Sequence, residues 1–208
     1  MHESGFDRKA ATWDAEIRRV ELARDVAAGI IDNVHPTREM DVMDFGCGTG
    51  LLTLDLQPHV RSITGVDTSS GMLDALEEKV RKQGITNVSA LNCDVVSGEK
   101  PEGRYHLIVS SMTLHHVTEL ETLFRFFFEL LLPGGTLCVA DLDKEDGTFH
   151  DDLTGVLHFG FERELVKSNL ADVGFTDLRD TIVTTINKGT PDKPRDYPVF
   201  LISAGKPE

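Results

Sequence analysis

A run of glycines at alternate positions between Asp44 and Gly50, in the stretch DFGCGTG, is the strongest chemical signal in the chain. It follows a short apolar run, Val42-Met43, and precedes a helical pattern that begins at Leu51. Glycine lets a backbone turn sharply from a strand into a helix, and it lets a ligand lie on that backbone because no Cβ is in the way. Free N–H groups at the start of a helix favour an anionic or polar ligand. The sequence therefore predicts a nucleotide-like ligand on this turn.

The glycine spacing departs from a dinucleotide-binding fingerprint, which needs glycine at the first, third and sixth positions. Counted from Gly46, the sixth position is Leu51, which disfavours a nicotinamide-dependent oxidoreductase and leaves it as an alternative. Two carboxylates end later apolar runs: Asp67, about 20 residues on, where such folds place a ribose-binding carboxylate, and Asp94. A carboxylate suits a ribose because it offers two acceptor oxygens and no donor.

The composition indicates one globular domain. The chain has 208 residues, of which 40% are hydrophobic, and a formal net charge of -14. This acidic excess repels phosphate backbones, so we expect no nucleic acid as a partner. Without a bilayer-length apolar stretch or a secretory signal at the N-terminus, a cytoplasmic protein with no membrane span is the expectation. Three cysteines without metal-ligand spacing, Cys47, Cys93 and Cys138, are expected to be buried or semi-buried free thiols.

Alternating strands and helices are the predicted scaffold for these residues. Apolar runs predict strands over 41–45, 61–66, 88–92, 105–110 and 136–141, and the first 40 residues, up to a stop at Pro36, read as helix. Helices are also predicted over 50–57, 70–83, 119–131 and 161–172. Two β-rich runs, 175–186 and 197–204, are joined by the polar turn-forming loop 188–194 and should form an antiparallel hairpin. Continuous apolar strands favour a parallel sheet covered on both faces, so the predicted fold class is α/β with a three-layer, doubly wound sheet.

Five stretches of the chain occur in an order and at a spacing that are typical of one known family: DFGCGTG, GVDTSSGML, LNCDV, YHLIVSSMTLHHV and LLPGGTLCVADL. Together they resemble class I S-adenosylmethionine-dependent methyltransferases, and most closely the small-molecule branch that includes ubiquinone and menaquinone biosynthesis methyltransferases. The resemblance implies a Rossmann-like, mostly parallel seven-stranded sheet with an antiparallel last strand. It also implies S-adenosyl-L-methionine as the cofactor and a small molecule as the methyl acceptor.

The resemblance assigns cofactor-binding roles to the residues of the glycine turn. Gly46, Gly48 and Gly50, with Cys47 between them, would let the methionyl and ribose parts approach the backbone. Asp67 would accept hydrogen bonds from the two ribose hydroxyls. The side chain of Cys47 is expected as filler rather than as a reactive thiol.

Further cofactor contacts are implied at the ends of other strands. Thr68 and Met72 would lie near the adenine and the ribose, although Met72 could equally belong to the core. Asp94 would accept from the exocyclic amine of the adenine, and the N–H of Val95 would donate to a ring nitrogen. Asp44, an unpaired carboxylate inside a strand, needs a donor partner, which the family supplies as the ligand's ammonium group or nearby N–H groups.

The segment before the first strand is implied to be a lid. Trp13-Asp14 is similar to the aromatic-Asp pair that precedes the domain in the small-molecule branch, so residues 1–35 would form a helical lid over a methyltransferase domain at 36–208. Ordinary core packing is the alternative for Trp13. Ser110, at the end of the fourth strand, would line the methionine moiety through its carbonyl.

Histidines are the candidate catalytic groups, because their pKa lies near neutrality. His115 and His116 follow the fourth strand and His158 follows the fifth, and for the pair a scaffold role is an equal alternative. A general base is needed only where the acceptor must lose a proton. We expect no metal, since the residues that could gather one fit no fixed motif: Asp141, Asp143, His150 and His158. The phenylalanines at 149, 159 and 161 could wall an acceptor pocket. The alternative function is a non-catalytic S-adenosylmethionine-binding regulatory protein.

Overall fold

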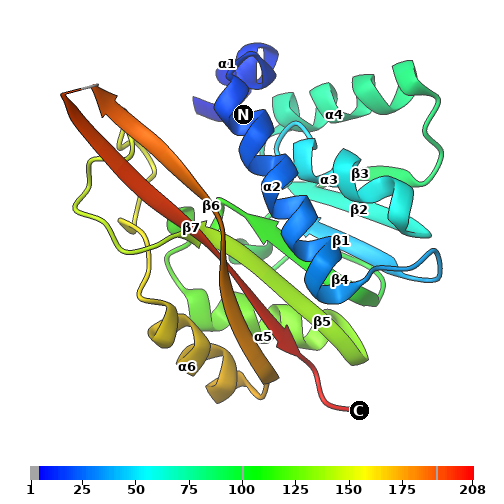
Figure 1. The fold of residues 1–208 in the computed structure, drawn as a ribbon. Helices are drawn as coiled ribbons and strands as arrows, with labels where there is room; N and C mark the ends of the chain where they lie inside the picture. The colour runs from blue at the N-terminus through cyan, green and yellow to red at the C-terminus, as the bar shows by residue number, and fades with distance from the viewer. Residues whose placement is uncertain (1–4, 100, 191) are drawn as a thin grey trace.

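The computed structural model of the chain describes residues 5–99, 101–190 and 192–208. Within these ranges, seven strands form one sheet in the order β3-β2-β1-β4-β5-β7-β6 (Figure 1). The strands are β1 (Asp41–Phe45), β2 (Ser62–Asp67), β3 (Val88–Asn92), β4 (Tyr105–Ser111), β5 (Leu131–Leu142), β6 (Thr176–Thr190) and β7 (Lys193–Gly205). The α-helices are α1 (Gly5–Lys9), α2 (Ile17–Val34), α3 (Leu51–Leu56), α4 (Ser70–Gln83), α5 (Leu120–Leu130) and α6 (Arg163–Val173).

The strand directions confirm the predicted fold class. Strands β1 to β5 pair in parallel, whereas β7 runs antiparallel to both of its neighbours, β5 and β6. The register places Phe45 of β1 beside Val66 of β2 and Ser110 of β4. The carboxyl ends of these strands therefore meet at one edge of the sheet, where ligands bind in open α/β folds.

Helices cover both faces of the sheet, which explains why the strands are apolar throughout. Helices α2, α3 and α4 lie on one face, and α5 and α6 pack on the other (Figure 1). Alternate strand residues divide between the two cores: Val42 packs toward α2 and α3, whereas Met43 packs toward Phe124 and Phe127 of α5. The phenylalanine-rich face of α5 is thus core. Among the described residues, no helix is both long enough and apolar enough to cross a membrane.

The prediction of one helix over the first 40 residues is wrong in detail. Helix α1 runs into a 3-10 turn over Ala10–Ala15, and the chain is extended at Glu16 before α2 begins. Helix α2 ends at Val34, and His35 follows with a left-handed φ of 52°. The helical periodicity belongs to α2, while the contacts of the preceding residues with the rest of the domain set their conformation. Residues 1–4 of this prediction lie outside the described residues.

The start of β5 and the turn between β6 and β7 also differ from the prediction. Strand β5 begins at Leu131, so Pro133-Gly134-Gly135 lies within it and not before it. In the predicted loop 188–194, residues 188–190 and 193–194 are strand, with Lys188 opposite Arg195 in the hairpin, and residue 191 lies outside the described residues. Pairing with a neighbouring strand overrides the weak intrinsic strand preference of these polar and glycine residues. The boundaries of the other four predicted helices differ from the observed ones by at most two residues, as expected for frayed ends.

Two glycines with left-handed backbone allow a matched test of packing around the site. Gly50 precedes α3 with a φ of 80°, and a Cβ there would lie 2.3 Å from Cδ1 of the buried Leu76. Gly84 caps α4 with a φ of 64°, and a Cβ there would meet nothing within 4 Å.

We expect Gly50→Ala to lower the free energy of unfolding by about 2–5 kcal/mol, because it adds overpacking against Leu76 to the left-handed strain. Gly84→Ala should lower it by about 1–2 kcal/mol from the strain alone. Urea denaturation of both variants measures the difference. Equal losses would contradict the close packing of α4 on the glycine turn.

Candidate functional site

The glycine turn is fastened to the end of β2 and leaves one backbone face open. The N–H groups of Gly46 and Cys47 donate to the carbonyl of Val66, at 2.8 and 3.1 Å. A Cβ at Gly46 would come within 2.3–2.8 Å of the Thr113 side chain, so this glycine is required by packing. At Gly48, with a φ of 53°, the nearest atom to such a Cβ would be a methionine sulfur 4.0 Å away. Gly48 is therefore the place in the turn where a ligand can lie against the backbone.

Asp67, at the end of β2, joins this turn to the start of α4. One carboxylate oxygen accepts from the N–H of Gly48 and the other from the N–H of Ser69, each at 2.8 Å. Burial raises the pKa of Asp67, and the N–H donors of Ser69 and Gly48 oppose that rise. Each oxygen keeps a second lone pair, so the side chain can still accept from a ligand hydroxyl. Thr68, which lies between Asp67 and Ser69 in the sequence, is exposed.

Asp44, in β1, is buried beneath the turn. Its Oδ2 accepts from the hydroxyl of Thr53 in α3 at 2.5 Å, which supplies the donor that the sequence called for. Burial raises the pKa of Asp44 to about 7, and the nearby charge of Asp67 acts in the same direction. The carboxyl group thus stands between its neutral and ionised forms at neutral pH, and a cation placed beside it would favour the ionised form.

Two sulfur side chains pack against the turn. Met72 of α4 is buried, and its sulfur lies 4.0 Å from the position that a Cβ would take at Gly48. Cys47 is buried against Gly65, and desolvation raises its pKa well above the usual thiol value. Such a thiol is a poor nucleophile, in line with the filler role. Cys93 and Cys138 are also buried and free, which confirms the prediction for the cysteines.

The residues expected around the adenine and the methionine moiety lie at neighbouring strand ends. Asp94 caps the 3-10 turn Val95–Ser97 by accepting from the N–H of Ser97 at 3.1 Å. Val95 is buried directly after it. Ser110 is buried at the end of β4, and its hydroxyl has no hydrogen-bond partner within the described part of the chain. These residues line one edge with the glycine turn, although Asp94 is already engaged by its own backbone.

The segment before β1 lies across the glycine turn. The carboxylate of Asp14 accepts from the hydroxyl of Thr49 at 2.6 Å and pairs with Lys79 of α4 at 2.8 Å. Asp7 accepts from the hydroxyl of Ser69 and the N–H of Gly71, at 2.6 and 2.9 Å. Sequence reasoning singled out the Trp13-Asp14 pair but missed Asp7, whose only signal is an acidic residue close to the N-terminus.

Aromatic contacts extend this cover to the histidines. The guanidinium of Arg19 lies 3.8 Å from the centre of the Trp13 ring. Phe6 packs edge-on against both Trp13 and His116, with ring centres 6.0 and 5.3 Å apart. Trp13 therefore packs within the covering segment, and Phe6 links that segment to the region after β4.

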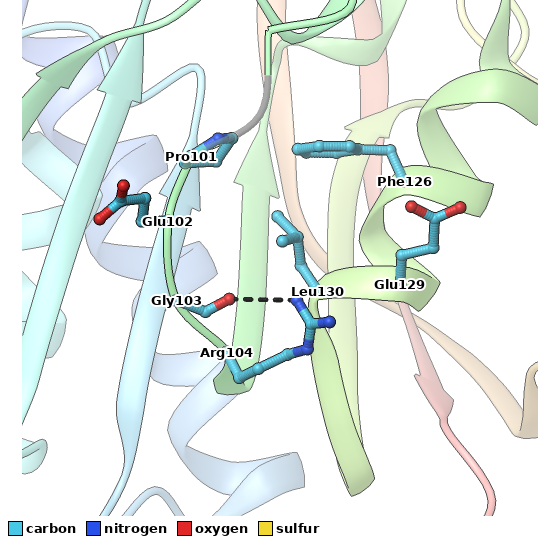
Figure 2. Close-up of a pocket in the computed structure, with 7 residues that line it drawn as sticks. All are labelled: Pro101, Glu102, Gly103, Arg104, Phe126, Glu129 and Leu130. Atoms are coloured by element: carbon cyan, nitrogen blue, oxygen red, sulfur yellow. Dashed lines mark hydrogen bonds between the residues drawn. The ribbon is translucent and has the colours of Figure 1, made fainter.

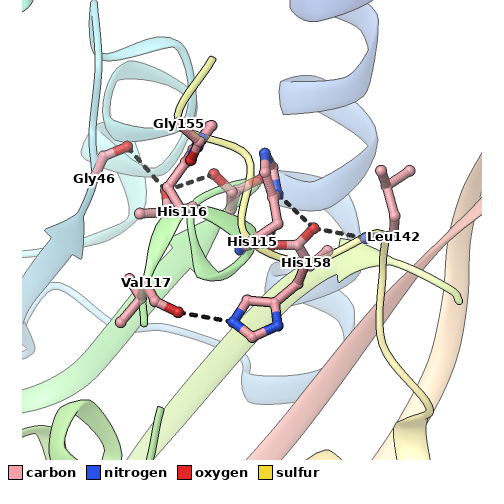
Figure 3. Close-up of polar contacts among 10 residues, drawn as sticks. Gly46, His115, His116, Val117, Leu142, Gly155 and His158 are labelled. Atoms are coloured by element: carbon pink, nitrogen blue, oxygen red, sulfur yellow. Dashed lines mark hydrogen bonds and ion pairs between the residues drawn. The ribbon is translucent and has the colours of Figure 1, made fainter. Parts of the chain in front are cut away.

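The structure brings His115 and His116 together with His150, which the sequence analysis named only as a possible metal ligand. Ring centres of His116 and His150 lie 4.2 and 4.8 Å from that of His115. His115 is buried, and its Nδ1 lies 2.8 Å from a carboxylate oxygen of Asp141, which is completely buried at the end of β5. Figure 3 shows the polar contacts that hold this region. The histidine cluster, defined here as His115, His116 and His150, thus stands on a buried carboxylate.

Hydrogen-bond partners assign the proton of His116. Its Nδ1 lies 2.7 Å from the carbonyl of Gly155, and a carbonyl only accepts, so Nδ1 carries the proton and Nε2 of the neutral ring keeps a lone pair. Burial, together with the neighbouring His115, lowers the pKa of His116. Burial likewise lowers the pKa of His150 to about 4. Both rings are therefore neutral at physiological pH, and His116 has the form that a general base needs.

His158 does not join the cluster. Its Nε2 donates to the carbonyl of Val117 at 2.9 Å (Figure 3). Its ring packs beside Phe161. Of the residues named as possible metal ligands, Asp143 is paired with Arg163, and the described residues hold no group of three suitable ligands. Of the phenylalanines proposed as pocket walls, Phe161 is buried in the core instead.

A hollow of about 590 Å³ lies at the amino ends of the parallel strands, away from the glycine turn (Figure 2). Its walls are residues 101–104, which precede β4, and the end of α5, which precedes β5. Because the chemistry-bearing residues gather at the carboxyl ends of the strands, this hollow is separate from the candidate site.

Comparisons with known proteins agree with this arrangement. Residues 42–135 match the family described as a methyltransferase domain. An uncharacterized methyltransferase of Schizosaccharomyces pombe is 35% identical over 156 residues, which cover 68% of this chain and 55% of that protein. A ubiquinone biosynthesis O-methyltransferase of Coxiella burnetii is 26% identical over 142 residues, covering 67% of this chain and 60% of that protein. The chain thus spans little more than half the length of these relatives.

Solved structures show the same fold. A putative methyltransferase of Haloferax volcanii, in complex with the Trm112 methyltransferase activator, has a TM-score of 0.78 at 16% identity, with all of both chains covered. A phosphoethanolamine N-methyltransferase of Haemonchus contortus, in complex with phosphomonomethylethanolamine and S-adenosylhomocysteine, has a TM-score of 0.71 at 16% identity, covering 88% of this chain and 52% of that one. By its matching domain, its relatives and its fold, the chain belongs to the class I S-adenosylmethionine-dependent methyltransferases.

Proposed function

We propose that this protein transfers a methyl group from S-adenosyl-L-methionine to a small-molecule acceptor. The observation that supports this most directly is the open backbone face at Gly48, beside a carboxylate, Asp67, that keeps free lone pairs. A nucleoside needs such a combination of bare backbone and paired acceptor oxygens. When bound, the cofactor supplies a methyl group on a sulfonium, which is a good leaving group.

Different residues around the turn would bind different parts of the cofactor. Asp67 would accept from the ribose hydroxyls, and the adenine would lie toward Thr68, Asp94 and Val95. Asp44, with its pKa raised to about 7, would face the ammonium group of the methionine moiety. Ser110, whose hydroxyl has no hydrogen-bond partner among the described residues, lies at the same end of the sheet, beside Phe45 of β1.

Residues 1–35 would act as the lid of a methyltransferase domain at 36–208. Support comes from Asp14 and Asp7, which bind the glycine turn and the start of α4, and from Phe6, which reaches His116. Enclosure of this kind excludes water from the reacting groups. The same contacts mean that the lid would have to loosen for ligands to enter or leave.

The acceptor is proposed to be a small molecule, methylated in the cytoplasm. The acidic surface disfavours nucleic acid, and the Coxiella relative is named for ubiquinone biosynthesis. Positioning supplies much of the acceleration in such a transfer. Where the acceptor must lose a proton, Nε2 of His116 would receive it, while Asp141 fixes the adjacent His115 as a positioning residue.

Incubation of the purified chain with labelled S-adenosylmethionine and a metabolite extract tests the proposed function. We expect label in a small-molecule product together with S-adenosylhomocysteine. Tight cofactor binding without any product would favour the alternative, a non-catalytic S-adenosylmethionine-binding regulatory protein. If the chain did not bind the cofactor, both the enzyme and the regulatory protein would be excluded.

We expect Asp67→Asn to weaken S-adenosylhomocysteine binding about 10- to 100-fold, because hydrogen bonds to a charged group contribute about 1.5–3 kcal/mol. Asp74→Asn is the matched control, since Asp74 is an exposed carboxylate on α4. Calorimetric titration of both variants measures the effect. Equal affinities in the two variants would show that Asp67 does not hold the ligand.

Cofactor binding should release protons near pH 7. The pKa of Asp44 is about 7 in the free protein, and an ammonium group beside it favours the ionised form, so affinity should rise as the pH rises through that value. Calorimetry in two buffers of different ionisation enthalpy counts the protons. Asp44→Asn should remove most of the release, and an unchanged proton count in that variant would exclude the assigned role.

We expect His116→Gln to lower kcat about 100-fold for an acceptor that must lose a proton, with cofactor affinity unchanged. His158→Gln is the control, because its ring is bound to the Val117 carbonyl outside the cluster. Steady-state kinetics over a pH range, with the acceptor found in the extract, separates the two. A larger loss in His158→Gln would reverse the assignment.

A further inference from the structure

A second hollow, of about 490 Å³, lies between the start of α2, the loop after β5 and the β6–β7 hairpin. In Figure 1 the hairpin extends beyond the rest of the sheet, beside the yellow loop that follows β5. Four cationic side chains line the hollow, with Asp151 as the only carboxylate among its described lining residues: Arg18, Lys188, Lys193 and Arg195. We call it the hairpin pocket. In a chain with a net charge of -14, this concentration of cations is opposite to the overall field.

Phe149 connects the hairpin pocket to the histidine cluster. The Nζ of Lys188 donates to the carbonyl of Phe149 and lies 4.7 Å from the centre of its ring. Phe149 also packs against His150, at 4.9 Å between ring centres, and His150 packs on His115. Phe149 therefore contacts both a cation of the hairpin pocket and a member of the histidine cluster.

The ion pairs of the pocket cations are exposed on at least one side, while Lys188 also donates to the Phe149 carbonyl. Arg18 pairs with Glu16 at 3.0 Å, Arg195 pairs with Asp146, and Lys188 lies 3.5 Å from the exposed Asp151. Exposed pairs of this kind contribute about 0–1 kcal/mol each, so an entering anion can replace them. Lys193 makes no ion pair with any other described residue.

Polar groups that do not carry charge complete the pocket. The buried Tyr197 ring forms part of the wall, and its hydroxyl is hydrogen-bonded to that of Thr148 at 2.7 Å. This bond connects the loop after β5 to the hairpin. Lys188 and Arg195 lie opposite each other on paired strands of the hairpin, and not on a free loop. Guanidinium and ammonium groups in such an arrangement bind carboxylates and phosphates, with arginine able to form two parallel hydrogen bonds.

We propose that the hairpin pocket binds an anionic oxygen group of the methyl acceptor, a carboxylate or a phosphate, and so orients the rest of that molecule toward the histidine cluster. This rests on the proposed function for the identity of the occupant as acceptor. The binding of the anion itself does not depend on turnover and can be measured separately.

Backbone amide shifts on titration with benzoate, phenyl phosphate and benzamide, at constant ionic strength and with saturating S-adenosylhomocysteine, test the proposal. The two anions should give saturable shifts at Thr148, Lys188 and Arg195, and the neutral benzamide should not. The tighter of the two anions identifies the group. Shifts of equal size with benzamide, or shifts that map elsewhere, would overturn the proposal.

A double variant, Lys193→Gln with Arg195→Gln, should weaken anion binding at least 10-fold. The matched control is Lys82→Gln with Arg125→Gln, which removes the same charge from exposed positions on α4 and α5. Equal losses in both would mean that net charge, not the pocket, attracts the anion. If the wild-type chain fails to bind S-adenosylhomocysteine, the proposed function fails, while the same titration without that ligand still tests the pocket.

Discussion

The carboxylate of Asp67 is the contact on which the geometry of the candidate site depends. Its two oxygens bind the backbone of two separate loops, at Gly48 and at Ser69. A single side chain thereby sets both the open face of the glycine turn and the start of α4. Because it is largely buried and held by N–H donors, the same group is rigid where a ligand would meet it. Thr113 and Leu76 then fill the space beside Gly46 and Gly50, which fixes the rest of the turn.

Carboxylates make many of the hydrogen bonds that hold the candidate site together at the carboxyl ends of the strands. Asp7 and Asp14 fasten the covering segment to hydroxyl and N–H groups of the turn and of α4. Asp44 is held by a hydroxyl below the turn, and Asp141 holds His115 farther along. The start of a helix presents N–H groups that favour negative charge, so the carboxylate of Asp7 is stabilised at the start of α4. The hairpin pocket, with the opposite charge, is then a distinct environment suited to a different part of a reaction complex.

Much of the fold could be predicted from the sequence, because apolar runs and glycine turns act locally. The parallel strands, the cap at Gly84 and the antiparallel last strand are all consequences of such patterns. The length of the β6–β7 hairpin could not be predicted, since pairing across the sheet decides it. Nor does any residue type signal the left-handed Met112, with a φ of 54°, which turns the chain after β4.

The candidate site divides in the same way. Asp67 and the glycines lie at strand ends and are visible as sequence motifs, and the structure brings them into contact. By contrast, the bond between His115 and Asp141 joins the 3-10 turn after β4 to strand β5, and His150 reaches them from a loop, so only the three-dimensional packing shows the cluster. Which nitrogen of His116 is free depends on the carbonyl of Gly155, a contact that has no signature in the sequence.

A crystal structure of the chain with S-adenosylhomocysteine bound tests the central claim most directly. The account predicts the nucleoside against the backbone of Gly48, with both ribose hydroxyls within hydrogen-bonding distance of Asp67 and the sulfur directed toward the histidine cluster. A ligand seated elsewhere, or a ribose that leaves the Asp67 oxygens bonded to backbone alone, would contradict it.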